Sequence, residues 1–233
     1  MTGLTLIIDT SVHGAAVGIL TEGRHDLIFS AVTEDVADSA RQLPLMVERG
    51  LKESGAESTD ISSIIVSQGP GSFTGIRVGL AYVYGLSFGL GSHSGNHPKV
   101  CGVSALKTLA ESLARREDVD IVLCLPSTKS GGYIAATRNG VATLGPVDLL
   151  VDDATFGWPN RWFMIGDWEM LSAKAGALND VTIVKLGAKD AARDSIHAMA
   201  DLMCQDGGIS WSQALPDAIY LRKSTVEEKA GPR

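Results

Sequence analysis

Apolar blocks separated by polar turns run through the first half of the chain and predict an ordered series of strands and helices. The blocks with strand-forming composition are residues 4–8, 15–20, 26–32 and 61–67. Between the third and the fourth, residues 37–54 carry apolar positions at helical spacing, and Gly55 follows where a left-handed C-cap is needed. With a second helix after the fourth block, the first half is predicted to follow the order β-β-β-α-β-α.

The longest apolar segment, residues 73–91, predicts a helix that must be covered, because Arg77 is its only charged residue. A helix of this length would reach roughly 28 Å, which approaches the span of a membrane. Arg77 and the six glycines from Gly71 to Gly91 argue against a membrane span. We therefore expect protein to cover it. Its apolar stripe consists of Ile76, Leu80, Val83 and Tyr84.

Four glycines of this segment form two pairs at i,i+4 spacing, Gly75/Gly79 and Gly85/Gly89. Small residues at this spacing allow the backbone of another element to come close. Two interpretations remain open: a core helix of a monomer, or a helix with one face completed by a partner protein.

The second half of the chain repeats strand and helix patterns. Strands are predicted at residues 99–103, 120–125, 133–137, 141–144, 162–165 and 181–185, and helices at 104–116, 168–177 and 191–204. We expect an N-terminal lobe over residues 1–102, a C-terminal lobe over 103–215, and a C-terminal segment, 216–233, whose end is flexible.

Composition narrows the functional classes. The 233 residues are 45% hydrophobic, with a net charge of −7 and no basic tract, which disfavours a protein that grips nucleic acid unaided. Its three cysteines lack metal-ligand spacing, which indicates reduced thiols. Since the first residues do not resemble a signal peptide, we expect a cytoplasmic location and no membrane association.

Two polar turns at strand ends are candidates for binding phosphate or magnesium through hydroxyls, a carboxylate and backbone amides. Their residues are Asp9, Thr10, Ser11, Gly69, Gly71 and Ser72. The alternative is that the carboxylate of Asp9 only bonds turn amides and that Ser72 only caps a helix. The second turn lacks the lysine and the spacing of a Walker motif.

No metal site is expected at His93 and His97, although they form an H-x3-H pair. Pro98 and the polar residues between them indicate a loop, so the two imidazoles are not held on one helical face. No nucleophile elbow of the GxSxG type is present.

Several segments together resemble the TsaB (YeaZ) family of the bacterial machinery that makes threonylcarbamoyladenosine on tRNA. They are LIIDTS (Leu6–Ser11), RQLPLM (Arg41–Met46), GPGSFTGIRVGL (Gly69–Leu80), GVSALKTLA (Gly102–Ala110) and IYLRK (Ile219–Lys223). The resemblance implies an α/β fold of the actin-like, Hsp70-like (ASKHA) class with two βββαβα-type lobes, the second of them degenerate. It also implies a non-catalytic partner of the related TsaD subunit, joined by the ATPase TsaE.

The chain departs from these families at three places. Ala105 and Leu109 stand where TsaD relatives have the two histidines of a metal motif, and neither can coordinate a metal. Pro126 stands where TsaB relatives usually have an aspartate, and Asp38 where a histidine is common. Independent nucleotide turnover is therefore disfavoured, and we expect no cofactor beyond vestigial ATP or ADP binding.

The leading hypothesis is an accessory subunit that stabilises TsaD through a helical interface and pairs with itself as a homodimer when TsaD is absent. Direct, strong binding of tRNA is not expected. The predicted interface residues are Leu43, Met46, Val47, Phe73, Ile76, Gly79, Leu80, Val83 and Gly85. The rival hypothesis is an independent actin-like ATPase or kinase-like enzyme that uses Asp9 and the Gly69–Ser72 turn.

Overall fold

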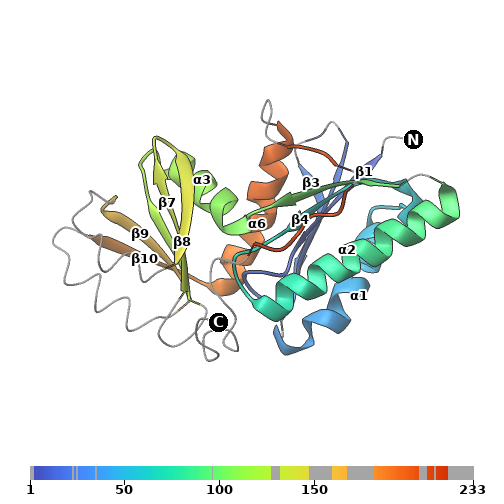
Figure 1. The fold of residues 1–233 in the computed structure, drawn as a ribbon, viewed down its shortest axis with the longest axis horizontal. Helices are drawn as coiled ribbons and strands as arrows, with labels where there is room; N and C mark the ends of the chain where they lie inside the picture. The colour runs from blue at the N-terminus through green and yellow to red at the C-terminus, as the bar shows by residue number, and fades with distance from the viewer. Residues whose placement is uncertain are drawn as a thin grey trace, which may run out of the picture.

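The computed structural model describes residues 3–22, 24, 26–34, 36–95, 97–126, 132–146, 159–166, 181–204, 209–212 and 214–219. These residues form two β-sheets with one pair of helices between them and another pair on the outer face of the first sheet (Figure 1). Short 3-10 helices lie at Val36–Asp38, Ser58–Asp60 and Leu202–Cys204.

The first sheet has five strands in the order β3-β2-β1-β4-β5. The strands are β1 (Leu4–Asp9), β2 (Ala16–Thr21), β3 (Leu27–Val32), β4 (Ile61–Ser67) and β5 (Lys99–Val103). β1, β2 and β3 form the predicted antiparallel meander, whereas β4 and β5 run parallel to β1. All six residues of β1 are buried, which explains why its sequence is a continuous apolar run rather than an alternating one.

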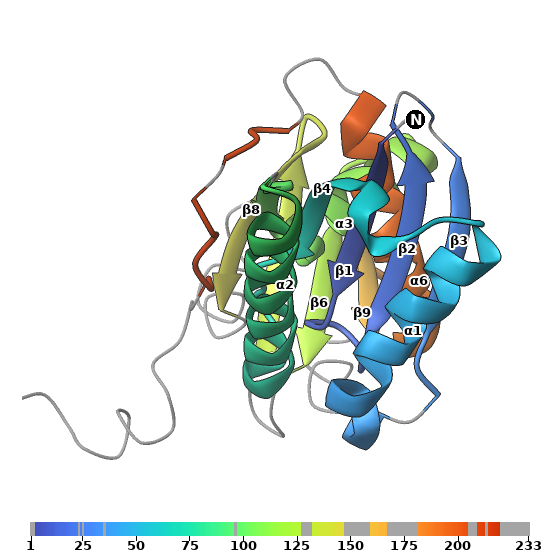
Figure 2. The same ribbon diagram turned by 90° about the vertical axis from the view of Figure 1, so that its right-hand side faces the viewer.

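Two helices cover one face of this sheet, α1 (Ser39–Glu53) and α2 (Phe73–Ser94) (Figure 2). α2 begins at Ser72, whose side chain accepts a hydrogen bond from the amide of Gly75, and ends at Gly95 in the left-handed conformation. Both helices were predicted from spacing, and the structure confirms them to within a few residues at their ends. No helix in the described part of the chain combines the length and the hydropathy that crossing a membrane requires.

The second sheet repeats the plan of the first, with five strands in the order β10-β9-β6-β7-β8. Its strands are β6 (Val122–Pro126), β7 (Gly132–Arg138), β8 (Val141–Pro146), β9 (Arg161–Ile165) and β10 (Thr182–Leu186). Again the first three strands are antiparallel and the last two run parallel to the first. The predicted α/β fold of the actin-like class is therefore confirmed, while the helix predicted over 168–177 lies outside the described residues.

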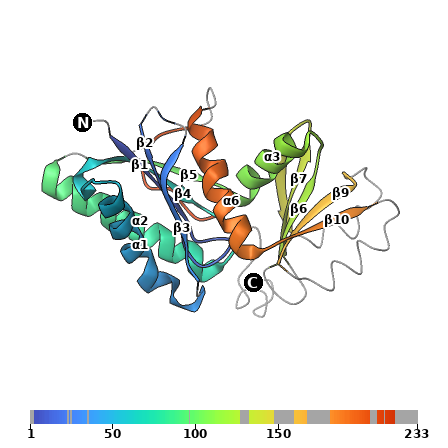
Figure 3. The ribbon, with the colours of Figure 1, turned by 180° about the vertical axis from the view of Figure 1, so that it is seen from behind.

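The two helices between the sheets each follow one sheet and pack on the other. α3 (Ala105–Glu117) follows β5 but contacts β6, β7 and β8, and α6 (Ala188–Asp201) follows β10 but contacts β1, β2 and β3. α3 and α6 also contact each other, and the view from behind shows them together at the centre of the molecule (Figure 3). The two sheets are thus joined by two helices, each of which follows one sheet and packs on the other.

A short segment near the C-terminus returns to the first sheet. Ser212 pairs with Val100 of β5, and the amide of Ile219 donates to the carbonyl of Gln68 at 2.8 Å. We call described residues 214–219 the strap. The division into lobes at Gly102 and at residue 215 stays a prediction.

Replacing Ile196 with alanine should destabilise the fold strongly, because its side chain is 1% exposed and lies against Gly18 of β2. Loss of a buried isoleucine costs about 2–5 kcal/mol of unfolding free energy, measured by urea denaturation. Val119→Ala is the control, since Val119 is 47% exposed and should change the free energy by less than about 0.5 kcal/mol. Equal losses for the two variants would contradict the interlobe packing described here.

Candidate functional site

The apolar side of α2 faces the chain's own core. Ile76, Leu80 and Val83 are buried in one cluster with residues of the first sheet and of α1. Leu43, Met46 and Val47 of α1 belong to the same cluster. These six side chains hold α1 and α2 on the sheet, and their role in a partner interface stays a prediction.

The opposite side of α2 is exposed and also weakly polar. Phe88 is 72% exposed and Phe73 is 44% exposed, values that are high for such large apolar side chains. Six of the exposed and half-buried positions follow heptad-like 4-3-4-3-4 spacing, and we call them the outer stripe: Thr74, Val78, Ala81, Gly85, Phe88 and Ser92. Heptad spacing with apolar and small residues is the pattern by which one helix packs against another.

The two glycine pairs of α2 serve different purposes. A Cβ at Gly75 would lie 2.0 Å from the carbonyl oxygen of Thr10, and one at Gly79 would lie 2.3 Å from the hydroxyl of Thr10. In contrast, a Cβ at Gly85 or Gly89 would meet no described atom within 4 Å. The first pair thus accommodates the end of β1, whereas Gly85 and Gly89 open outward beside Phe88; that Gly79 and Gly85 contact a partner stays a prediction.

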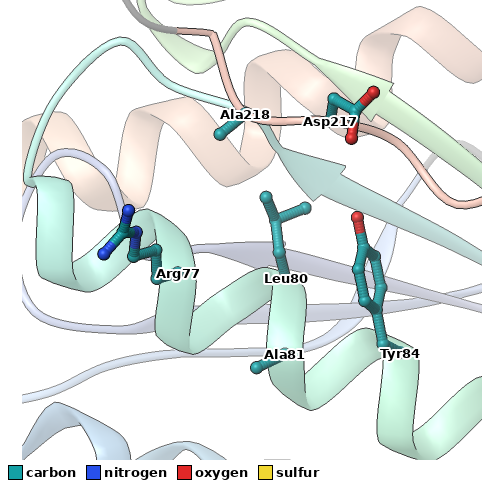
Figure 4. A pocket seen from close by; sticks show the side chains of 6 residues that line it. All are labelled: Arg77, Leu80, Ala81, Tyr84, Asp217 and Ala218. Carbon is teal, nitrogen blue, oxygen red and sulfur yellow. The ribbon is translucent and has the colours of Figure 1, made fainter. Parts of the chain in front are cut away.

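A groove of about 470 Å³ lies between α2 and the strap (Figure 4). Its lining residues are Arg77, Leu80, Ala81, Tyr84, Asp217 and Ala218. The guanidinium of Arg77 also lies over the ring of Phe73, 3.8 Å from its centroid. Since Ala81 belongs to both, the groove adjoins the outer stripe.

The hydroxyl of Tyr84 fixes the strap on α2 by donating to the carbonyl of Pro216. Partial burial, together with the nearby carboxylate of Asp217, raises the pKa of Tyr84, and burial raises the pKa of Tyr82 to about 12. Both phenols are therefore protonated donors at neutral pH. The sequence pattern did not indicate this contact, because Tyr84 and Pro216 lie far apart in the chain.

The polar corner at the end of β1 brings together most of the residues predicted to bind phosphate. Asp9, Thr10 and Ser11 are each 1% exposed, and the Gly69–Ser72 turn lies directly against them. The amide of Ser72 donates to the carbonyl of Ser11 at 2.9 Å. Gly71, at φ +157°, has no room for a Cβ, which would lie 2.2 Å from that same carbonyl oxygen. Within the described residues, Thr10 Oγ1 is buried without a hydrogen-bond partner.

The positions that depart from the related families lie at a strand end and in the hydrophobic core. Pro126 is the last residue of β6, just as Asp9 is the last residue of β1, so the second sheet carries a proline at the corresponding point. Ala105 and Leu109 lie in the core, fully buried or nearly so. The residues from Ser127 to Gly131 lie outside the described part of the chain.

His97 and Asp38, which the sequence analysis singled out, both have contacts within the chain. The ring of His97 packs over Gly91, and among the described residues no group of three or more potential metal ligands is found. Asp38 accepts hydrogen bonds from Arg41 at 2.9 Å, which lowers the pKa of this carboxyl, with a smaller contribution from Gln42. Asp38 is thus a charged residue preceding α1, paired within its own helix turn.

Comparisons with known proteins agree with this architecture. Residues 34–137 match the family described as TsaD, tRNA N6-adenosine threonylcarbamoyltransferase. The chain is 27% identical to the tRNA threonylcarbamoyladenosine biosynthesis protein TsaB of Escherichia coli K12, over 96% of each chain. It is 36% identical to TsaB of Haemophilus influenzae Rd over 38% of this chain and 37% of that protein.

Two solved structures from Pseudomonas aeruginosa share the fold. A protein with similarity to peptidase YeaZ superposes with a TM-score of 0.67 at 24% identity, and YeaZ itself with 0.64 at 21% identity. Each covers 94% of this chain and all of the other. The fold and the sheet order define an α/β protein of the actin-like class. Within that class, the similarities support assignment of the chain to the TsaB (YeaZ) family.

The glycine pairs of α2 should respond to substitution in opposite directions. Gly75→Ala should destabilise the protein by about 1–3 kcal/mol, because its Cβ would overlap the Thr10 carbonyl. Gly85→Ala should stabilise it by about 0.5–1 kcal/mol, the usual gain of alanine over glycine in a helix. Urea denaturation of both variants provides the measurement. A destabilising Gly85→Ala would show that this position is covered within the chain itself.

Proposed function

We propose that this protein is the accessory subunit of a tRNA threonylcarbamoyladenosine modification complex, in which it binds and stabilises TsaD. Similarity over nearly the whole chain to TsaB of Escherichia coli supports the pathway, and the TsaD family match supports kinship with that partner. The single observation that carries the binding role is the outer stripe of α2, with Phe88 at 72% exposure.

The outer stripe supports an interface rather than a solvated surface. Its six positions include no charged residue, and there is open space at Gly85 and at Gly89, the residue after Phe88. An exposed aromatic side chain beside small residues is suited to interlock with a partner helix, because each side chain can enter a gap on the other. The groove beside Ala81 extends this surface towards the strap.

Helix α1 supplies the polar border of this surface. Leu45 is 49% exposed, and Ala40 and Pro44 are exposed as well, but the other exposed residues of α1 are charged, including an ion pair of 3.0 Å between Arg49 and Glu53. Exposed ion pairs contribute little to affinity, and they favour correct partners by complementarity. The proposed interface therefore has its apolar centre on α2 and its rim on α1.

Catalysis is assigned to TsaD and not to this chain. Ala105 and Leu109, which the family resemblance aligns with metal-binding histidines of TsaD, are core positions. Transfer of the threonylcarbamoyl group to adenosine would take place on TsaD, with TsaE joining the complex, and no resident cofactor is proposed for this chain. Its net charge of −7 favours tRNA contact through the partners.

Two further features belong to the same proposal. Without TsaD, the outer stripe would pair with the same surface of a second copy in an isologous homodimer. A cytoplasmic location is proposed because Cys101 and Cys124 are free, buried thiols, in keeping with a reducing compartment.

Phe88→Asp should weaken binding to a TsaD protein of the same organism at least tenfold, since a central aromatic anchor commonly contributes about 2 kcal/mol or more. Binding is measured by calorimetry or surface plasmon resonance. Val141→Asp is the matched control, because Val141 is 60% exposed but lies on the second sheet. Gly85→Leu should act like Phe88→Asp by filling the gap. Unchanged affinity for both α2 variants would rule out the outer stripe.

Reconstituted tRNA modification should depend on this chain. TsaD, TsaE, the adenylate-forming enzyme and tRNA are combined with the wild-type chain, with Phe88→Asp, or with neither, and threonylcarbamoyladenosine is quantified by mass spectrometry. Product formation is expected only with the wild-type chain at equal protein concentrations. Full modification in its absence would refute the accessory role.

A further inference from the structure

Asp9 is the end point of a buried network of hydrogen bonds. Its Oδ1 accepts from the amide of Ser11 at 2.8 Å and from the hydroxyl of Ser11 at 2.6 Å, and its Oδ2 accepts from the hydroxyl of Ser195 at 2.5 Å. Ser195 is 0% exposed and lies on α6, the helix that arrives from the second sheet. Its single hydroxyl proton has two acceptors within reach, the Asp9 carboxylate and the Ala192 carbonyl, and the charged group is the stronger one.

The network continues from Asp9 to the turn that starts α2. The hydroxyl of Ser67 donates to that of Ser11 at 2.9 Å, and the amide of Gly69 donates to Ser67 at 3.2 Å. The hydroxyls of Ser67 and Ser11 each accept one bond and donate the next, so that the bonds polarise one another towards the carboxylate. Asp9 therefore connects α6 on one side of the sheet with the glycine turn on the other.

These contacts leave the corner poorly suited to a magnesium nucleotide, the ligand that actin-like ATPases imply. Oδ1 already accepts two protein donors and Oδ2 one, so three of the roughly four acceptor positions of the carboxylate are taken before a magnesium ion or its water shell could use them. The corresponding strand end in the second lobe carries Pro126 instead of a second carboxylate.

Four amides at the glycine turn and the start of α2 are likewise engaged within the chain. Those of Gly69 and Ser72 donate to Ser67 and Ser11, and those of Gly75 and Ile76 donate to Ser72. A phosphate bound at this helix N-terminus would have to displace these bonds. With three acceptor positions of Asp9 taken and Pro126 at the matching strand end, these residues are a poor fit for a magnesium nucleotide.

We propose that Asp9 is an internal anchor that joins the two lobes by fixing Ser195 of α6 and, through Ser11 and Ser67, sets the position of α2. In this chain the Ser195 hydroxyl donates a hydrogen bond to the Asp9 carboxylate. A nucleotide-binding relative would direct that carboxylate towards its ligand. The anchor is independent of which partner the outer stripe binds.

Hydrogen exchange of Ser195→Ala tests the anchor, with Ser63→Ala as the matched control. Ser63 is also buried, and among the described residues its hydroxyl bonds the neutral hydroxyl of Thr5, at 2.7 Å. Ser195→Ala should raise amide exchange in residues 188–201 and 69–76 together, and Ser63→Ala in neither. Because bonds to charged groups are roughly twice as strong, Tm should fall about twice as far for Ser195→Ala. Faster exchange confined to α6 would overturn the proposed coupling.

Asp9→Asn keeps the size and shape of the Asp9 side chain, and it allows a second test of the coupling between Asp9 and Ser195. In the Asp9→Asn background, Ser195→Ala should lower Tm by less than it does in the wild-type chain, because the negative charge that accepts the Ser195 hydrogen bond is already absent. Fully additive losses would contradict the anchor.

Calorimetry with millimolar Mg-ATP addresses the nucleotide directly. The wild-type chain, folded and free of partners, should give no saturable binding. Stoichiometric binding that Asp9→Asn abolishes would overturn the proposal and would restore Asp9 as a ligand-binding carboxylate.

Discussion

The close approach between the end of β1 and the start of α2 is the constraint on which the rest of the structure depends. Oxygen atoms of Thr10 and Ser11 fill the positions that Cβ atoms at Gly71, Gly75 and Gly79 would take. Only glycine permits α2 to lie this close to the sheet, and the resulting contact buries Ile76, Leu80 and Val83. The rotation of the helix about its axis is thereby set, and with it the identity of the residues left exposed.

The exchange of helices between the sheets links this local contact to the whole molecule. α6 starts from the second sheet and packs on the first, where Ser195 meets the Asp9 carboxylate and Ile196 meets β2. α3 makes the reverse crossing. Each sheet is therefore covered on one face by a helix that follows the other sheet. A change in the polar corner would for this reason alter the packing of both sheets.

Residues with similar apolar character on α2 have opposite roles because of where they point. Ile76, Leu80 and Val83 stabilise the chain itself, whereas the outer stripe, centred on Gly85 and Phe88, presents an uncharged surface to solvent. Such a surface is costly unless a partner covers it. This division gives the proposed accessory role a physical basis that does not require any catalytic group in the chain.

The sequence by itself determined the order of strands and helices, because apolar periodicity and capping residues such as Ser72 and Gly55 act locally. It also indicated that α2 must be covered and that its glycines mark close contacts. Only the tertiary structure decided which glycine pair faces the chain and which faces outward, since both pairs have the same spacing. The partner of Asp9 was beyond sequence reasoning for a similar reason: Ser195 lies 186 residues away and is one serine among many until the fold brings α6 across the sheet.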